Sequence, residues 1–306
     1  MARSWMRPPG ALAWLAAALL GAGCGKSDTP KNSRSGEEEK EPPAAKPAPA
    51  PAAAPATPRP PDLARLHQSF LQATRKDPPP DQRPPDVTRT GKSVGKLYGE
   101  VVRLWDGIRF ARPDGTRIHY RAVLDTELGE IEIALDADRA PNHVRNFIAL
   151  CKAGYYDGLV FDRIDQQEAH AEDQDFHYEG IEAGCPLGVG DLLSNSIGYW
   201  LRPEFGAGAT HEEGTVGACR VMDDEDTAAC KFYISLCKAP YLDGHYTVFG
   251  KVTRGLDVAK KVFLRPTIIE DDDGGSHRPE KPVVIRKVTI HSHEAPATMK
   301  ATVSSR

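Results

Sequence analysis

The distribution of proline places the strongest limit on what this 306-residue chain can fold into. Fifteen of its 26 prolines lie between Pro30 and Pro85. Within residues 24–61, the charged run GEEEKE is followed by PPAAKPAPAPAAAPATPRPP. Such a composition offers too little apolar surface to form a core and favours an extended, solvated chain. We therefore predict a disordered tether over 24–61 and a folded region confined to the residues after it.

The N-terminus has the layout of an export signal. Arg3 and Arg7 precede the apolar run ALAWLAAALLGAG, which ends in small residues directly before Cys24. The run is too short to span a membrane comfortably. LLGAGC resembles a bacterial lipoprotein signal, although Gly21 stands where leucine is usual. We expect a signal peptide over 1–23 and a protein exported and lipid-anchored through Cys24 to a bacterial cell-envelope membrane, on its periplasmic side. The alternative is an ordinary signal peptide with an incidental cysteine.

The charge and the remaining cysteines narrow the classes of function. A net charge of -4 without a run of Lys or Arg gives nucleic-acid binding no electrostatic support. An exported location permits disulfides, but the odd number of remaining cysteines leaves at least one unpaired within the chain. No CxxC pair indicates a metal or redox site, so we expect neither metal nor cofactor. The cysteines after Cys24 are Cys151, Cys185, Cys219, Cys230 and Cys237.

The spacing of apolar residues predicts two helices at the start of the folded region and a mixture of strands and two further helices after them. Residues 62–76 and 92–105 carry apolar residues at helical spacing, and we assign 62–118 to a helical extension. Residues 141–152 and 255–262 predict two more helices, the first with Pro141 in its opening turn. Between and after them, alternating segments predict many short strands. We expect a mainly β fold with a closed or nearly closed antiparallel barrel over 119–293, and a flexible tail over 294–306.

The order of these segments resembles the cyclophilin-type peptidyl-prolyl cis-trans isomerases. The resemblance runs from about Tyr120 to His291, and no single motif would carry it alone. The motifs are APNHVRNFIAL, GYYDGLVFDRI, IEAGCPLG, IGYWLRPEF, GTVGACR, KFYISL and YLDGHYTVFGKV. The resemblance implies a cyclophilin-like fold, a closed antiparallel barrel of about eight strands with two capping helices. It also implies that the protein acts on proline-containing polypeptides.

The resemblance also implies that Arg163, two residues after Phe161, is the catalytic arginine. Chemistry supports this role for an arginine. Rotation about an X-Pro amide localises the lone pair on nitrogen, so a donor aimed at that nitrogen binds the twisted transition state more tightly than either planar isomer. The alternative is that Arg163 only faces solvent or a carboxylate.

Other positions follow from the family motifs. The resemblance implies that Tyr233 forms the floor of a proline pocket, where the family has phenylalanine, and that Tyr241 stands at a frequent tryptophan. Two replacements change charge, because Glu182 and Lys231 stand at glutamine positions, and Glu182 follows Arg163 after a longer link than in the family. We hypothesise that Glu182 orients Arg163 while Lys231 offsets the surplus negative charge. The complete predicted substrate-binding set is Phe161, Glu182, Cys219, Arg220, Lys231, Tyr233, Tyr241, Leu242 and Tyr246.

Our leading interpretation is a monomeric, lipid-anchored prolyl isomerase that assists the folding of exported proteins. The main alternative is a cyclophilin-like module that binds proline-containing segments with weak catalysis. A metal-dependent function could be built from His170, Asp173, Asp175 and His177, but their irregular spacing in a polar stretch favours solvated loop residues.

Overall fold

The computed structural model describes residues 65–79, 82–171, 174–191, 194–206, 208–221, 224–269 and 276–295. Its helices are η1 (Arg65–His67), α2 (Phe70–Ala73), α3 (Val94–Trp105), α4 (Pro141–Lys152), η2 (Glu225–Thr227), η3 (Pro240–Leu242) and α5 (Leu256–Phe263), where η marks a 3-10 helix. Its strands are β1 (Thr74–Arg75), β2 (Arg117–Thr126), β3 (Gly129–Leu135), β4 (Phe161–Ala171), β5 (Gln174–Ala183), β6 (Trp200–Leu201), β7 (Thr215–Ala218), β8 (Phe232–Ser235), β9 (Val248–Arg254), β10 (Thr267–Ile269), β11 (Ser276–Pro279) and β12 (Ile285–Ala295).

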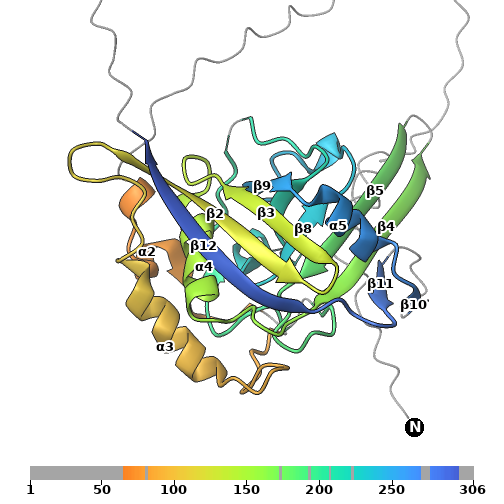
Figure 1. Ribbon diagram of the computed structural model, residues 1–306, viewed down its shortest axis with the longest axis horizontal. Helices are drawn as coiled ribbons and strands as arrows, with labels where there is room; N and C mark the ends of the chain where they lie inside the picture. Colours follow the sequence, from red (N-terminus) through yellow and green to blue (C-terminus); the bar gives the residue numbers. More distant parts are fainter. Residues whose placement is uncertain are drawn as a thin grey trace, which may run out of the picture.

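One antiparallel sheet of ten strands dominates the fold, in the order β10-β11-β4-β5-β8-β7-β9-β3-β2-β12 (Figure 1). The eight strands from β4 to β12 correspond to the predicted barrel, and β10 and β11 are added beyond β4. The protein is therefore mainly β, as predicted, with more strands than expected. Strand β12 continues to Ala295, two residues past the predicted end of the domain.

The seam between β12 and β4 differs from the predicted closed barrel. The bridge Val160–Val284 joins the two ends, with backbone bonds from Phe161 N to Val283 O and from Ile285 N to Leu159 O of 2.9 and 2.8 Å. A bulge follows Phe161, and β11 then occupies the edge of β4 at Ile164 and Asp165. Because β11 pairs with β4 from Ile164 onward, β12 meets β4 only over this short stretch. Among the described residues, β12 and β4 are thus joined by one bridge and its neighbouring backbone bonds.

The main core lies between the sheet and helix α4. Eleven of the twelve residues of α4 are buried, and Pro141 occupies its first turn, where the missing N–H costs nothing. Helix α5 buries Val258, Ala259 and Val262 against the same core. Its N-cap, Gly255, has φ +83°, and a Cβ there would lie 2.0 Å from Glu130 O, so only glycine fits this turn. These two helices are the predicted capping helices.

The N-terminal extension belongs to the same core. Helix α3 buries Val94, Leu97, Val101 and Trp105, and its N-cap Ser93 side chain accepts from Lys96 N. The prediction of a single helix over 62–76 is wrong. Ser69 begins the short helix α2 with a capping box, and the chain then extends into β1, which pairs with β6. Leu71 is consequently 69% exposed instead of lying on a buried stripe.

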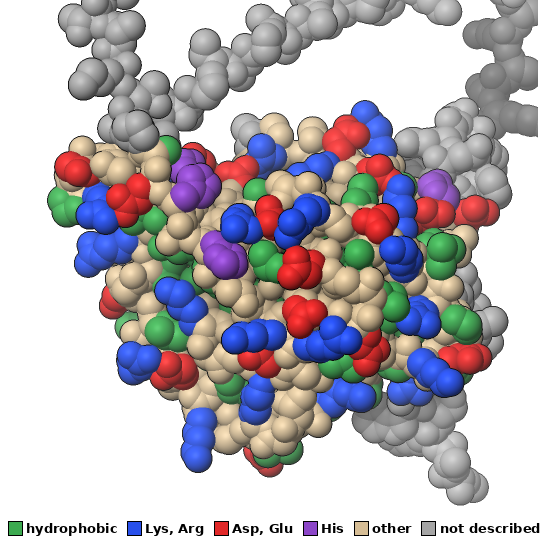
Figure 2. Space-filling view, in the orientation of Figure 1, with side chains coloured by type: hydrophobic (Ala, Val, Ile, Leu, Met, Phe, Trp, Pro, Cys, Tyr) green, Lys and Arg blue, Asp and Glu red, His purple; other side chains and the backbone are tan. Residues whose placement is uncertain are grey.

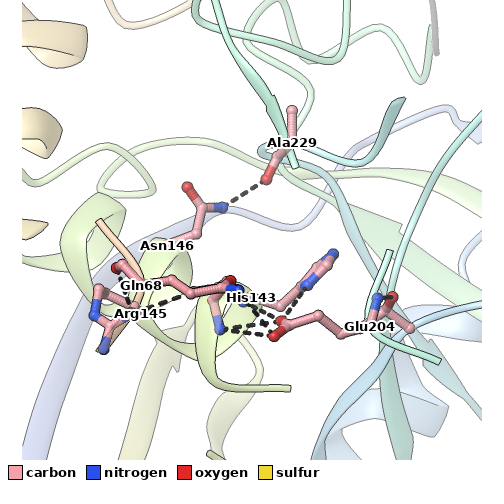
Figure 3. A network of polar contacts seen from close by, with 8 residues as sticks. Gln68, His143, Arg145, Asn146, Glu204 and Ala229 are labelled. Atoms are coloured by element: carbon pink, nitrogen blue, oxygen red, sulfur yellow. Dashed lines mark hydrogen bonds and ion pairs between the residues drawn. The ribbon is translucent and has the colours of Figure 1, made fainter. Parts of the chain in front are cut away.

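A buried polar network ties the extension to α4 (Figure 3). The Glu204 carboxylate accepts from the backbone N–H groups of Asn142 and His143 at the first turn of α4, where a negative charge is favoured. Asn142 Nδ2 also donates to Gln68 Oε1 at 2.6 Å. Arg145 donates to backbone carbonyls of the extension, including Ile108 O at 3.2 Å. The extension and helix α4 are therefore joined by polar as well as apolar contacts.

The long link predicted between Arg163 and Glu182 is a β-hairpin. Strands β4 and β5 pair from Phe161–Ala183 to Ala171–Gln174, and the hairpin extends beyond the rest of the sheet (Figure 1). Only its base pairs with β8, from Gly180 to Ala183.

The face formed by β12, β2 and β3 carries mixed charges. Figure 2 shows basic and acidic side chains interspersed over it. Arg254 and Glu130, for example, form an ion pair at 3.0 Å, and both are more than half exposed. Exposed pairs of this kind contribute little to stability. Among the described residues, no helix has both the length and the apolar character needed to cross a bilayer.

Candidate active site

Arg163, Glu182, Tyr233 and Gly217 form one row across four neighbouring strands. Arg163 on β4 pairs with Glu182 on β5, Glu182 with Tyr233 on β8, and Tyr233 with Gly217 on β7. Residues directly opposite in adjacent strands project from the same face of a sheet. The register therefore brings together three of the predicted site residues, which lie far apart in the sequence.

A small apolar cluster, separate from the main core, lies beside this row. Its buried members are Tyr178, Cys219, Tyr233, Ala239, Leu242 and Tyr246, with Cys237 and Tyr241 packed against it. Five of these residues, Cys219, Tyr233, Tyr241, Leu242 and Tyr246, were predicted for the site. The rings of Tyr233 and Tyr246 meet edge to face, with centroids 6.0 Å apart. Aromatic walls of this kind suit the flat apolar face of a proline ring.

Tyr233 is held through its hydroxyl group by a histidine and an aspartate. Tyr233 Oη lies 2.7 Å from His211 Nε2, and His211 Nδ1 lies 2.7 Å from Asp243 Oδ1. Burial lowers the pKa of His211, and the hydrogen bond to Asp243 opposes that effect. With a neutral imidazole, Nδ1–H donates to the carboxylate and the Tyr233 hydroxyl donates to Nε2. The extra hydroxyl of this tyrosine is thus satisfied within the protein.

Gly217 makes room for that tyrosine. A Cβ at Gly217 would lie 2.2 Å from both Cζ and Oη of Tyr233. Gly180 has the same relationship to Tyr178, whose Oη would be 2.5 Å from a Cβ at Gly180. Two glycines therefore let two tyrosine rings lie flat against the sheet.

A buried group of charges lies next to Arg163. Lys231 Nζ bonds to the Glu182 carboxylate and lies 3.5 Å from Asp162 Oδ1. Burial alone would lower the pKa of Lys231, but Glu182 and Asp162 together raise it above its ordinary value. Burial raises the pKa of Asp162 to about 6, and Lys231 opposes this rise. The lysine is therefore charged and shared between two carboxyl groups.

The carbonyl of Gly190 connects this group to the arginine. Gly190 O accepts from Arg163 Nη1 and from Lys231 Nζ, each at 3.3 Å. Gly190 has φ +72°, and a Cβ there would contact the Arg163 side chain at 3.6 Å. The loop 184–191 thus sets the position of both cations.

Asp165, two residues after Arg163 on β4, is a further buried acid. It is 2% exposed, and its Oδ1 accepts from Gln167 Nε2 at 2.9 Å. Burial raises the pKa of Asp165 to about 7, Glu182 adds to the rise, and Arg163 opposes it. This carboxyl group therefore changes protonation near neutral pH, close to the arginine.

Arg220 and Tyr241 line the edges of the site. Arg220 Nε donates to His245 O at 2.8 Å, and its guanidinium lies 4.7 Å from the centre of the Tyr246 ring. Tyr241 Oη donates to His177 O on the hairpin at 3.2 Å. The hairpin is therefore bonded directly to Tyr241, which packs against the apolar cluster.

The structure does not bring Phe161 to this group. It is fully buried in the main core, because the bulge after it separates its orientation from that of Arg163. We correct its assignment from substrate binding to packing.

Cys24 lies outside the described residues. The cysteines at 151, 185, 219, 230 and 237 are all free thiols.

Sequence reasoning missed Tyr178, His211, Asp243, Asp162 and Asp165. Tyr178 lies on hairpin strand β5 and belongs to the apolar cluster around Tyr233. No local pattern marks His211 or Asp243, which are 32 residues apart. Among the described residues, no group of three or more His, Cys, Asp or Glu side chains could hold a metal ion. The metal alternative involving His170, Asp173 and Asp175 falls outside the described side chains.

Known proteins resemble this chain over the sheet domain. Residues 121–290 match the family described as cyclophilin type peptidyl-prolyl cis-trans isomerase/CLD. The chain is 34% identical over 149 residues to peptidyl-prolyl cis-trans isomerase-like 1 of Rhizopus delemar, covering 49% of this chain and 83% of that protein. It is 32% identical over 171 residues to peptidyl-prolyl cis-trans isomerase-like 3 of Gallus gallus, covering 56% and 95%.

The crystal structure of a cyclophilin type isomerase from Cryptosporidium parvum aligns with TM-score 0.46 and 22% identity, covering 57% of this chain and 99% of that one. The sequence comparisons decide the family. The chain belongs to the cyclophilin-type peptidyl-prolyl cis-trans isomerases, which is an enzyme family.

Proposed function

We propose that the protein catalyses cis-trans isomerisation of X-Pro bonds in polypeptides at the site around Arg163. The observation that carries this is the cross-strand row in which Arg163, Glu182 and Tyr233 lie in register beside a separate apolar cluster. The cluster would take the proline ring, and Arg163 would approach the prolyl nitrogen. This chemistry needs no nucleophile.

The chemistry needed is stabilisation of a twisted amide. Uncatalysed rotation has a barrier of about 18 to 20 kcal/mol and relaxes over about 10 to 100 s. As the bond twists, the nitrogen becomes a hydrogen-bond acceptor, and a fixed guanidinium donor stabilises that state more than the planar ones. Hydrogen bonding of Arg163 to Gly190 O limits its motion before substrate arrives.

The test is isomerisation of a short proline peptide by the purified protein, with Arg163→Ala as the control. Faster relaxation than in buffer, lost in the variant, is the expected result. Equal rates with and without the protein would refute the proposal. A binding module remains the second candidate, because a buried Lys231–Glu182 pair stands where the family has two amides. Such a binding module would bind the peptide without accelerating its cis-trans relaxation.

The cellular setting is also a proposal. The run ALAWLAAALLGAGC supports export and lipid anchoring through Cys24 to a bacterial cell-envelope membrane. An isomerase held there would act on exported polypeptides as they fold, since isomerisation of X-Pro bonds is slow enough to limit folding. We propose that it does so as a monomer.

A further inference from the structure

The N-terminal extension contacts both loops that lead into the site. We propose that Arg75 and Arg89 are positioning residues, which hold loop 224–230 and loop 184–191 in place and thereby fix the two cations of the site, Arg163 and Lys231. This inference rests on the isomerase function proposed above and gives the extension a part in it. The two contacts are independent of each other and lie on different loops.

Arg89 braces loop 184–191. Arg89 N donates to Pro186 O at 2.7 Å. Its side chain lies across Gly188, where a Cβ would be 2.7 Å from Arg89 Cδ. Gly190, two residues later, supplies the carbonyl that accepts from Arg163 and Lys231. A shift of the arginine stem would therefore move the acceptor that holds Arg163.

Arg75 braces loop 224–230. Its Nη2 lies 3.0 Å from Asp224 Oδ2 and its Nη1 lies 3.8 Å from Asp226 Oδ2. These three side chains are 25%, 30% and 31% exposed, so the ion pairs are partly shielded from water. The loop ends at Cys230, directly before Lys231. Arg75 therefore holds the loop that carries Lys231 into the buried charge group.

The extension is packed tightly enough against the rest of the protein to hold these two loops in position. Phe70 of α2 meets Trp105 and Tyr199 edge to face, with ring centroids 5.2 and 5.0 Å apart. Lys92 Nζ donates to Asp157 O at 2.8 Å, on the turn that leads into β4. Packed interiors resist deformation, so they transmit position from one side to the other.

Paired variants separate the two contacts by their chemistry. Arg89 acts through its methylene stem, so Arg89→Ala should lower kcat/KM while Arg89→Met should retain it. Arg75 acts through its charge, so Arg75→Met should lower kcat/KM and Arg75→Lys should recover part of it. We expect losses of about three- to ten-fold, typical of residues that act through others. Arg103→Ala is the control, because Arg103 lies on α3, is 68% exposed and pairs with Glu100.

Amide hydrogen exchange gives a readout that does not need catalysis. Loop 184–191 should exchange faster in Arg89→Ala and loop 224–230 faster in Arg75→Met, with the main core and Arg103→Ala unchanged. If the wild-type protein proves inactive, the isomerase proposal fails while exchange still decides whether the brace exists. Unchanged exchange in both loops would overturn the brace. An Arg89→Met variant as impaired as Arg89→Ala would overturn the stem contact.

Discussion

Lys231 and Glu182 form a buried ion pair immediately beside Arg163, and Asp162 lies within 3.5 Å of the same lysine. The direct bond between Lys231 and Glu182 agrees with the hypothesis that their opposite charges compensate. Orientation of Arg163 by Glu182 stays a hypothesis. The family has neutral glutamine side chains at these two positions, so the stability of this site depends on an ion pair instead.

Replacing one member of this pair should destabilise the protein more than replacing both. Lys231→Gln leaves the Glu182 carboxylate buried without this partner, and Glu182→Gln leaves Lys231 with Asp162 and the Gly190 carbonyl. Each should lower the free energy of unfolding by about 3 to 5 kcal/mol, and the double change should recover much of the loss. The measurement is a double-mutant cycle in denaturation midpoint and isomerase rate.

The exposed pair Arg254–Glu130 is the matched control, since neutralising it should have little effect. Additive effects of the two buried changes would show that Lys231 and Glu182 do not act as a pair.

Arg163→Lys should lose most of the isomerase activity and keep the fold. Lysine keeps the charge but offers no planar fork, so it cannot hold a donor against the prolyl nitrogen. We expect a fall in kcat of about 100-fold, as for loss of one fixed donor in other active sites. Circular dichroism and thermal unfolding check the fold. A Lys variant with the wild-type rate would assign Arg163 a structural role.

Asp165 should make stability depend on pH. Its folded-state pKa of about 7 is above the ordinary value of 3.8, because the buried acid prefers its neutral form. The folded state then holds more protons than the unfolded chain between these values. This contribution to stability is fully present below about pH 4 and is lost as pH rises through about 7. Asp165→Asn should remove that decline and be more stable than wild type at pH 8.

Denaturation midpoints measured from pH 4 to pH 8 test this expectation. The exposed acid Asp257 provides a matched control, because Asp257→Asn should leave the decline in place. Parallel pH profiles for the wild-type protein and Asp165→Asn would contradict the assignment.

Gly217→Ala should displace the floor of the apolar cluster. The new methyl group would lie 2.2 Å from Tyr233, so the ring must move and its bond to His211 must break or shift. We expect destabilisation of about 1 to 3 kcal/mol and a raised KM for proline peptides. Gly99→Ala is the control: this site on α3 has open space, so alanine should stabilise by up to about 1 kcal/mol. An unaltered KM in Gly217→Ala would exclude Tyr233 from the pocket.

Cys24→Ala should release the protein from the membrane fraction. Stable anchoring needs more than one acyl chain, and a lipoprotein-type modification of Cys24 would supply them. Fractionation followed by immunoblotting measures the effect, with Cys151→Ala as a control that keeps the anchor. A Cys24→Ala protein that stays firmly membrane-bound would argue against lipidation there.

The local sequence was sufficient for most elements of the sheet domain. Helix α4 was predicted from its apolar stripe and Pro141, and β3 from strict alternation. The helix predicted over 62–76 failed, because Ser69 caps a short helix and pairing of β1 with β6 overrides the helical spacing. Pairing with a distant strand leaves no mark on local periodicity.

The sequence by itself determined the family motifs, the candidate arginine and most residues of the apolar cluster. Only the tertiary structure decided which strands are neighbours, and therefore that Glu182 bonds to Lys231, that Tyr178 joins the cluster from the hairpin, and that Asp243 and His211 hold Tyr233. Register and the bulge after Phe161 set these contacts, because a one-residue change in pairing moves a side chain to the opposite face of the sheet.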